Sequence, residues 1–388
     1  MNKKAIAILG AIFLLIVGTL GFLVYSKYST KAPASGLTVA TTTPLSAVTP
    51  TPVAAATPTS TPGSSIVQLT SNQVISPALF FNGSGITYFD NQGNLYQANL
   101  QNNNGQLTLT GNTKLDVPAK SGVTKILWPS KGNDFIAEIN NGTSTTYSYF
   151  NSAAATYTDL PPQVESLDWM PNGTQVMYIW LQNGKSSLSL GSPDTKTYQT
   201  LAPMWENDDQ LSVSPDGSQA LYFETNNTGA NNFINSVSAD GKIFKGLVKV
   251  GQNYGVLWSP DGQKFLFGKK DPETQEYQIW YNNLTADIVE NLGLFTTVDK
   301  VVWGSDSNTI YAAVPNSQPS VGNALTVDSF YKMDTTTLSK TQYQTSTSTP
   351  VDGENLFLDS TGQNLFFKNA QDGGLYYLNL SQAQAQGQ

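Results

Sequence analysis

A six-residue phrase that recurs along the chain constrains the fold more than any other feature of the sequence. Its clearest copy is Trp258-Ser259-Pro260-Asp261-Gly262-Gln263, which lies between two short apolar runs. Proline sets the φ angle that the second position of a turn requires, and glycine accepts a positive φ without steric cost. Apolar residues alternate on both sides, so each unit is predicted to be a strand, a tight turn and a second strand.

Degenerate copies of this phrase follow one another at intervals of 41–55 residues. The lead positions of the seven copies are Phe81, Trp128, Trp169, Val213, Trp258, Trp303 and Leu358. Four strands with their turns need about 40–45 residues, the length of one propeller blade. The sequence therefore predicts an all-β, seven-bladed propeller of four-stranded antiparallel blades. Six blades are the alternative, because the first copy is weak.

The last unit offers too few strands to complete a blade before the chain nearly ends. An orphan strand, Ile66–Thr70, precedes the first unit. We predict that it completes the last blade and closes the ring, which removes the two open sheet edges.

The repeat resembles the TolB-like propeller repeats of bacterial envelope proteins, which carry the same Ser-Pro-Asp-Gly turn after an apolar or Trp position. Similar blades form the propeller domain of prolyl-oligopeptidase and dipeptidyl-peptidase enzymes. The resemblance covers roughly residues 66–380. It implies a blade type and no particular activity, because the motif is structural in that family.

The N-terminal residues divide into an apolar segment and a linker. Residues 1–31 hold Ala5–Tyr25, about 20 mostly apolar residues after two lysines, which predicts one transmembrane signal-anchor helix with a cytoplasmic tip. A cleaved signal peptide is the alternative. Residues 32–65 are rich in Pro, Thr, Ala and Ser and are predicted to be a disordered linker, or alternatively an O-glycosylated stalk. The propeller would span residues 66–380, and residues 381–388 would be a disordered tail.

Composition excludes several classes of function. The chain has no His and no Cys, so His-metal sites, Cys-ligated zinc, thiol catalysis and a Ser-His-Asp triad are impossible. All 20 basic residues are Lys, and the net charge is −8, which disfavours nucleic acid as a partner. Asp306-Ser307-Asn308 lacks the full spacing of a calcium loop. We therefore expect no metal and no cofactor.

Two groups of residues are assigned to the repeat itself and are predicted to be structural. The recurring indoles are expected to pack between neighbouring blades, and the prolines, aspartates and glycines to form the turns. These residues are Trp128, Trp169, Trp258, Trp303, Pro215, Asp216, Gly217, Pro260, Asp261 and Gly262.

Candidate binding residues lie where the blades differ, in loops that the register brings to one face of the ring. One loop joins two blades, another joins the second and third strands of the unit around Trp258, and a longer polar loop spans Pro315–Asn323. The candidates are Trp205, Glu206, Asp208, Asp209, Asp271, Glu273, Glu276 and Asp299. An acidic rim with one indole would suit a cation, a basic peptide or a glycan, and solvated loops are the plainer interpretation.

The leading functional prediction from these patterns is a membrane-anchored, extracytoplasmic propeller that binds a protein or cell-wall partner and is not an enzyme. The alternative is a carboxylate-dependent glycoside hydrolase or a glycan-binding propeller, because hydrolysis needs only two suitably placed carboxylates. Asp208, Asp209, Glu273 and Asp299 are the candidates for that chemistry. A spacer without a ligand is a third possibility. We expect a monomer at the cell membrane, held by a single span.

Overall fold

The structure is a computed structural model that describes residues 64–80, 83–204, 210–224, 232–250, 253–271, 273–274, 276–317, 325–343, 345–346, 350–381 and 385–387. The predicted membrane anchor and linker lie outside these residues. Within the described part of the chain, no helix is both long enough and apolar enough to cross a membrane.

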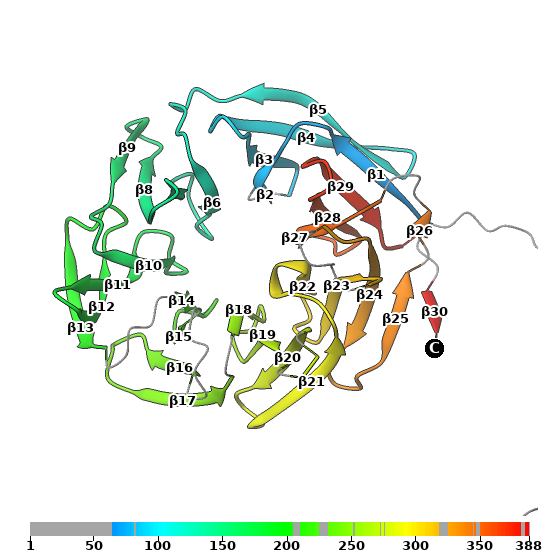
Figure 1. Ribbon diagram of the computed structural model, residues 1–388. Coiled ribbons are helices and arrows are strands. Elements are labelled where there is room, and N and C mark those ends of the chain that lie inside the picture. Colours follow the sequence, from blue (N-terminus) through cyan, green and yellow to red (C-terminus); the bar gives the residue numbers. More distant parts are fainter. Residues whose placement is uncertain are drawn as a thin grey trace, which may run out of the picture. The chain divides into compact units, whose positions relative to one another are not determined.

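Seven antiparallel sheets, each with four principal strands, lie around a ring with their first strands innermost (Figure 1). Blade one consists of β2 (Ile75–Leu79), β3 (Gly85–Phe89), β4 (Leu95–Asn103) and β5 (Gln106–Lys114). Blade two consists of β6 (Val123–Leu127), β7 (Phe135–Asn140), β8 (Thr145–Asn151) and β9 (Thr156–Asp159). Blade three consists of β10 (Val164–Trp169), β11 (Val176–Gln182), β12 (Lys185–Gly191) and β13 (Tyr198–Pro203). Blades four and five are β14 (Gln210–Val213), β15 (Gln219–Phe223), β16 (Phe233–Ser238) and β17 (Phe244–Lys249); and β18 (Asn253–Trp258), β19 (Lys264–Lys270), β20 (Tyr277–Asn283) and β21 (Ile288–Leu294).

Blades six and seven contain additional short strands. Blade six follows the 3₁₀ turn η1 (Val298–Lys300) and consists of β22 (Val301–Trp303), β23 (Thr309–Pro315), β24 (Asp328–Asp334) and β25 (Lys340–Tyr343), with β30 (Ala385–Gly387) added at its edge. Blade seven consists of β27 (Gly353–Leu358), β28 (Asn364–Asn369), β29 (Leu375–Asn379) and β1 (Ser64–Thr70), with β26 (Thr345–Ser346) beside β1. β30 lies in the segment for which the sequence predicted a disordered tail.

The ring closes through its two chain ends. β1 pairs antiparallel with β29, with Ile66 opposite Leu378 and Val67 opposite Tyr377. The seven-bladed, four-stranded antiparallel prediction is confirmed, and the six-bladed alternative is wrong because the weak first copy also forms a complete blade.

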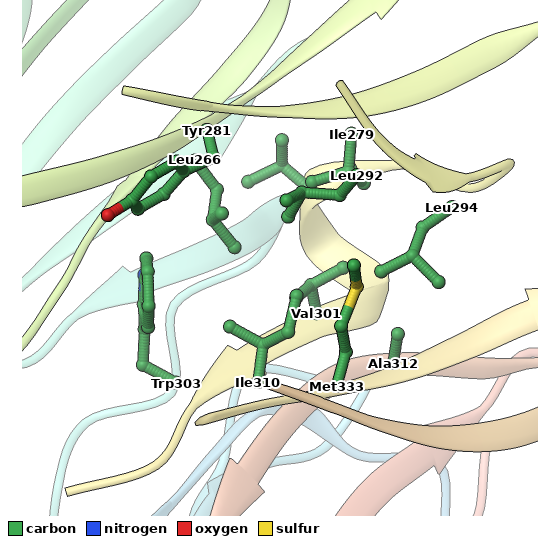
Figure 2. Close-up of a cluster of buried hydrophobic side chains, with 11 residues drawn as sticks. Leu266, Ile279, Tyr281, Leu292, Leu294, Val301, Trp303, Ile310, Ala312 and Met333 are labelled. Atoms are coloured by element: carbon green, nitrogen blue, oxygen red, sulfur yellow. The ribbon is translucent and has the colours of Figure 1, made fainter. Parts of the chain in front are cut away.

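Apolar side chains fill the spaces between successive blades. Figure 2 shows one such cluster, in which Leu266 and Ile279 of blade five face Trp303, Ile310 and Met333 of blade six. All five side chains are at most 5% exposed. Full burial of one large apolar side chain contributes about 1.5–3 kcal/mol, so packing between blades contributes strongly to the stability of the ring.

Candidate functional site

The meander of each blade places its connections on two opposite faces. The turns between first and second strands lie on one face, which we call the turn face. The connections between second and third strands, and those between blades, lie on the other, which we call the loop face. Each face therefore collects one type of local sequence from all seven blades.

On the turn face, the recurring phrase is a closed hydrogen-bonded unit. The Ser259 hydroxyl donates to Asp261 Oδ1 at 2.5 Å, and that same oxygen accepts the Gln263 N–H at 3.0 Å. Gly262 has a φ of +67°, which permits its N–H to reach the Ser259 carbonyl at 2.9 Å. The Asp261 N–H donates to the Ser307 hydroxyl of the next blade at 3.0 Å. These polar atoms of the motif are therefore used within the turn or against the neighbouring blade, and the motif leaves little to bind a ligand.

The recurring tryptophans join adjacent blades. Each indole Nε1 donates to a carbonyl on the innermost strand of the preceding blade: Trp128 to Ser76, Trp169 to Leu127, Trp258 to Ser212 and Trp303 to Leu257, at 2.9–3.2 Å. The latter three are 5–7% exposed. Their rings are unavailable for stacking on a sugar.

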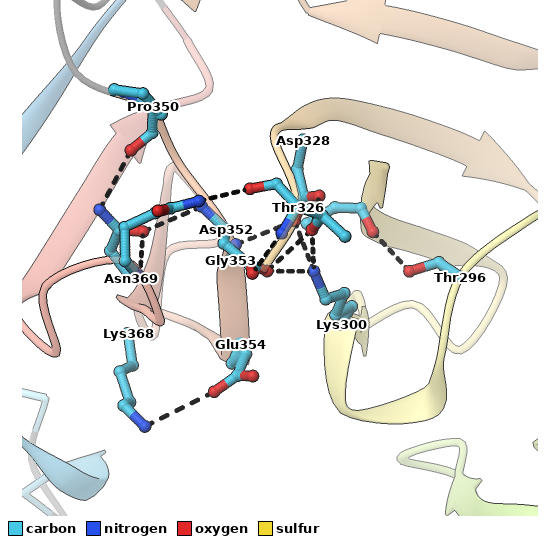
Figure 3. A network of polar contacts seen from close by, with 12 residues as sticks. Thr296, Lys300, Thr326, Asp328, Pro350, Asp352, Gly353, Glu354, Lys368 and Asn369 are labelled. Carbon is cyan, nitrogen blue, oxygen red and sulfur yellow. Dashed lines mark hydrogen bonds and ion pairs between the residues drawn. The ribbon is translucent and has the colours of Figure 1, made fainter. Parts of the chain in front are cut away.

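A buried charged cluster lies on the loop face where blades six and seven meet (Figure 3). Lys300 Nζ donates to Asp328 Oδ2 at 2.8 Å, to the Thr326 hydroxyl at 2.9 Å and to Asp352 Oδ1. The side chains of Lys300, Asp328 and Asp352 are 9%, 0% and 3% exposed. Three separate connections of the ring supply them: η1, the start of β24 and the residue before β27.

Burial and the neighbouring charges set the direction in which the pKa values of Lys300 and Asp328 shift. Burial alone would lower the pKa of Lys300, but the carboxylates of Asp328 and Asp352 outweigh it and hold that pKa above its usual value. Burial raises the pKa of Asp328, although Lys300 opposes the shift. Two carboxylates share one ammonium, so one negative charge is incompletely compensated.

Glu354 lies two residues beyond Asp352, at the start of β27, and differs from the buried cluster in being accessible. Its Oε2 is 3.5 Å from Lys368 Nζ, and the two side chains are 32% and 28% exposed. Burial raises the pKa of Glu354, Lys368 opposes the shift, and the carboxylates of Asp299 and Asp352 reinforce it. A reachable carboxyl with a raised pKa is suited to transferring a proton.

Lys368 also borders a hollow of about 290 Å³ on the loop face between blades seven and one. Gln73, Asn91, Gln371 and Asp372 contribute to its lining. Asn91 donates to Gln73 at 2.9 Å and Gln371 to the Thr326 carbonyl at 2.8 Å, which orders the surrounding loops. Amide, ammonium and carboxylate groups around a hollow are the chemistry that recognises hydroxyl-rich ligands.

The structure describes only some of the binding residues that the sequence predicted. Trp205, Glu206, Asp208 and Asp209 lie outside the described residues. Asp271, in the β19–β20 connection, accepts the N–H groups of Glu273 and Thr274 at 2.9 Å and thereby forms a turn. Glu273 and Glu276 lie in the same connection, with Glu273 exposed. Asp299 is exposed in η1, and its charge acts on Glu354.

Sequence reasoning missed Lys300, Asp328, Asp352, Glu354 and Lys368. Asp299 was selected and its neighbour Lys300 was not, because no spacing motif connects residue 300 with residues 328 and 352. The available signal was local: Lys300 and Asp352 each come just before the innermost strand of a blade.

No family model matches the sequence, and no curated protein sequence matches it. Solved structures do match. An oligogalacturonate lyase in complex with manganese has a TM-score of 0.57 at 10% identity, over 83% of this chain and 94% of that one. The oligogalacturonate lyase of Vibrio parahaemolyticus has a TM-score of 0.55 at 12% identity, over 81% and 91%. Hydrazine synthase of Kuenenia stuttgartiensis has a TM-score of 0.51 at 14% identity, over 69% and 79%.

At such identities the likeness shows the fold, and a shared fold does not fix an activity. It nevertheless corrects the leading prediction. A non-catalytic binding or scaffold module, and the statement that the chain is not an enzyme, are contradicted because these similar structures include oligogalacturonate lyases, which are enzymes. The propeller part of the proposed resemblance holds, and the TolB-like type is not established by these structures.

The manganese of the first similar structure has no matching ligand set here. The chain has no His and no Cys, and the described residues contain no group of three or more His, Cys, Asp or Glu side chains that could hold a metal. The residues that the structure describes therefore do not fit that ion.

Proposed function

We propose that this chain is a carbohydrate-active propeller that hydrolyses a glycosidic bond at the loop face of blades six and seven. The observation that carries the proposal is Glu354, a reachable carboxyl whose pKa is raised and which lies 3.5 Å from Lys368, a residue that lines a polar hollow. The likeness to oligogalacturonate lyases supports a glycan as the ligand class.

The carboxyl groups of Glu354 and Asp299 would have different roles. Glu354 would give its proton to the leaving glycosidic oxygen, because burial favours its protonated form. Asp299 is exposed and would serve as the second carboxylate, activating water or attacking the sugar directly. Lys368 and the amides around the hollow would hold the hydroxyl or acidic groups of the adjoining sugar.

The experiment is incubation of the propeller with a panel of neutral and acidic polysaccharides, with products read by mass spectrometry. Hydrolysis adds one water to the summed mass of the products, whereas an elimination does not, so the reaction type is read directly. Glu354→Gln should lower turnover by at least about 100-fold, and Asp299→Asn should lower it comparably. Glu165→Gln is the matched control, the same substitution on an exposed residue near the start of the innermost strand of blade three, and should be fully active.

Undiminished turnover by Glu354→Gln would contradict the assignment of the proton donor. No cleavage of any polysaccharide would contradict the enzyme, and binding of the same panel would then distinguish a glycan-binding propeller.

We further propose that the blades are of the TolB-like type and that the propeller works outside the cytoplasm, anchored by residues 1–31. The Ser-Pro-Asp-Gly turns support the first statement, and the apolar Ala5–Tyr25 segment supports the second. Protease accessibility of the propeller in intact cells tests the location.

A further inference from the structure

The Lys300 ammonium is bound in the way that a protein binds a free cation. Its acceptors are Asp328 Oδ2, Asp352 Oδ1 and the hydroxyl of Thr326, all of them oxygen atoms and all buried. Carboxylate and hydroxyl oxygens of this kind are the ligands of hard metal ions. The charge of the oxygen atoms also suits a cation, because two carboxylates surround the single positive charge of Lys300.

The oxygens are held in place from behind, independently of the ammonium. Asp352 Oδ2 accepts the Thr326 N–H at 2.8 Å, and Asp328 Oδ2 accepts the Gly353 N–H at 2.9 Å. The Thr326 hydroxyl donates to Asp328 Oδ1 at 2.6 Å. Figure 3 shows these bonds beside those that Lys300 Nζ makes to the same carboxylates. Because main-chain groups fix the carboxylates, their geometry should persist when the lysine side chain is shortened.

We propose that Lys300 is the built-in cation of this oxygen site, occupying with its ammonium the position that a small free cation would take, and that the filled site fixes the start of β27.

A consequence for the active site rests on the proposed function. The Gly353 N–H is bound to Asp328, and Glu354 is the next residue. Lys300 would therefore be a positioning residue, which holds the Glu354 carboxyl beside Lys368 without touching the substrate.

The test is chemical rescue of Lys300→Ala. This variant should melt at a lower temperature than the wild type, and Mn²⁺, Ca²⁺ or methylammonium should raise its melting temperature by several degrees. Hydrogen exchange at Gly353–Leu358 should be faster in the variant and slow again when the cation is added. The wild-type protein should respond to none of these ions.

Lys264→Ala is the matched control. The Lys264 ammonium is also partly buried, but it donates to the Ser307 carbonyl at 2.9 Å and to the Asn308 side chain, which are neutral acceptors. Its loss should not be rescued by cations. The triple variant Lys300→Ala, Asp328→Asn, Asp352→Asn should likewise show no response.

Equal rescue of both lysine variants, or no rescue of Lys300→Ala, would overturn the proposal. If Lys300→Ala does not fold in any buffer, nitrogen NMR of the lysine ammonium groups tests the proposal on the wild-type protein. We expect one slowly exchanging ammonium signal, which is lost in Lys300→Gln. Absence of that signal contradicts the proposal. Neither readout uses a substrate, so failure here is distinguishable from failure of the proposed hydrolase. If that activity exists, the same cations should restore turnover to Lys300→Ala.

Discussion

Two junctions between blades use aspartate in different ways. At the junction of blades three and four, Asp168 accepts the N–H of Trp169 and the N–H of Val213, each at 2.8 Å, so main-chain donors satisfy both carboxylate oxygens. At the junction of blades six and seven, Asp328 and Asp352 accept from main-chain donors and also from Lys300.

This difference distinguishes a junction that belongs to the scaffold, at Asp168, from the junction that holds the candidate site, at Asp328 and Asp352. A carboxylate that binds only main-chain groups needs nothing beyond the blade repeat, and its role is to join two inner strands. The cluster around Lys300 needs side chains from three connections and lies on the loop face, and its last member, Asp352, is two residues before Glu354. The predictions below test this division, beginning with the largest expected effect.

The largest loss of stability is expected at a junction held by an indole. Trp258→Ala should lower the free energy of unfolding by about 3–5 kcal/mol, because it leaves a cavity between blades four and five and removes the bond to the Ser212 carbonyl. Urea unfolding measures this effect. Below its melting temperature the variant should retain glycan turnover, since the site lies on other blades. A stable variant that has lost ligand binding would show that the indole belongs to a site.

The sequence predicted the scaffold well because the information is local and repeated. The turn at Ser259–Gln263 and the position of Trp258 are each encoded within a few residues, so seven copies reveal seven blades. The bounds of outer strands are less well encoded: the outermost strand of blade five is Ile288–Leu294, and its ladder is irregular near Gly293, which has a φ of +63°. Outer strands carry weaker apolar patterns, so their bounds are harder to predict.

The candidate site was not predicted because connections far apart in the sequence assemble it, and ring closure completes its hollow. Lys300 and Asp352 are 52 residues apart, and Lys368 borders a hollow that also contains Gln73 from the other end of the propeller. No local spacing encodes such contacts. Asp299 was selected for its charge, and only the structure shows that it acts on Glu354.

A pair of identical substitutions should distinguish the two junctions directly. In Asp168→Asn, the amide NH₂ must replace an acceptor and face a main-chain N–H, so a loss of about 1–3 kcal/mol is expected. In Asp328→Asn, the amide oxygen can still accept hydrogen bonds from Lys300 and Gly353. The amide NH₂ can donate to the Thr326 hydroxyl, which can in turn donate to Asp352 Oδ1, 3.0 Å away. The loss should stay within about 1 kcal/mol.

Equilibrium unfolding of both variants at neutral pH measures the contrast. If Asp328→Asn is the more damaging of the two, the cluster depends on its full charge, and the division drawn here between the two junctions is wrong.

The smallest effect concerns the pH dependence of stability at Glu354. Burial raises the pKa of Glu354 above its ordinary 4.5, so the native state binds this proton more tightly than the unfolded state does. Stability from this group is therefore greatest below the unfolded pKa and falls as pH rises through the native value. Glu354→Gln lacks this loss, so its free energy of unfolding relative to wild type should increase as pH rises from below the unfolded pKa through the raised native pKa. A pH-independent difference for Glu354→Gln would mean that its carboxyl is solvated as in the unfolded chain, which would remove the physical basis for assigning it the proton transfer.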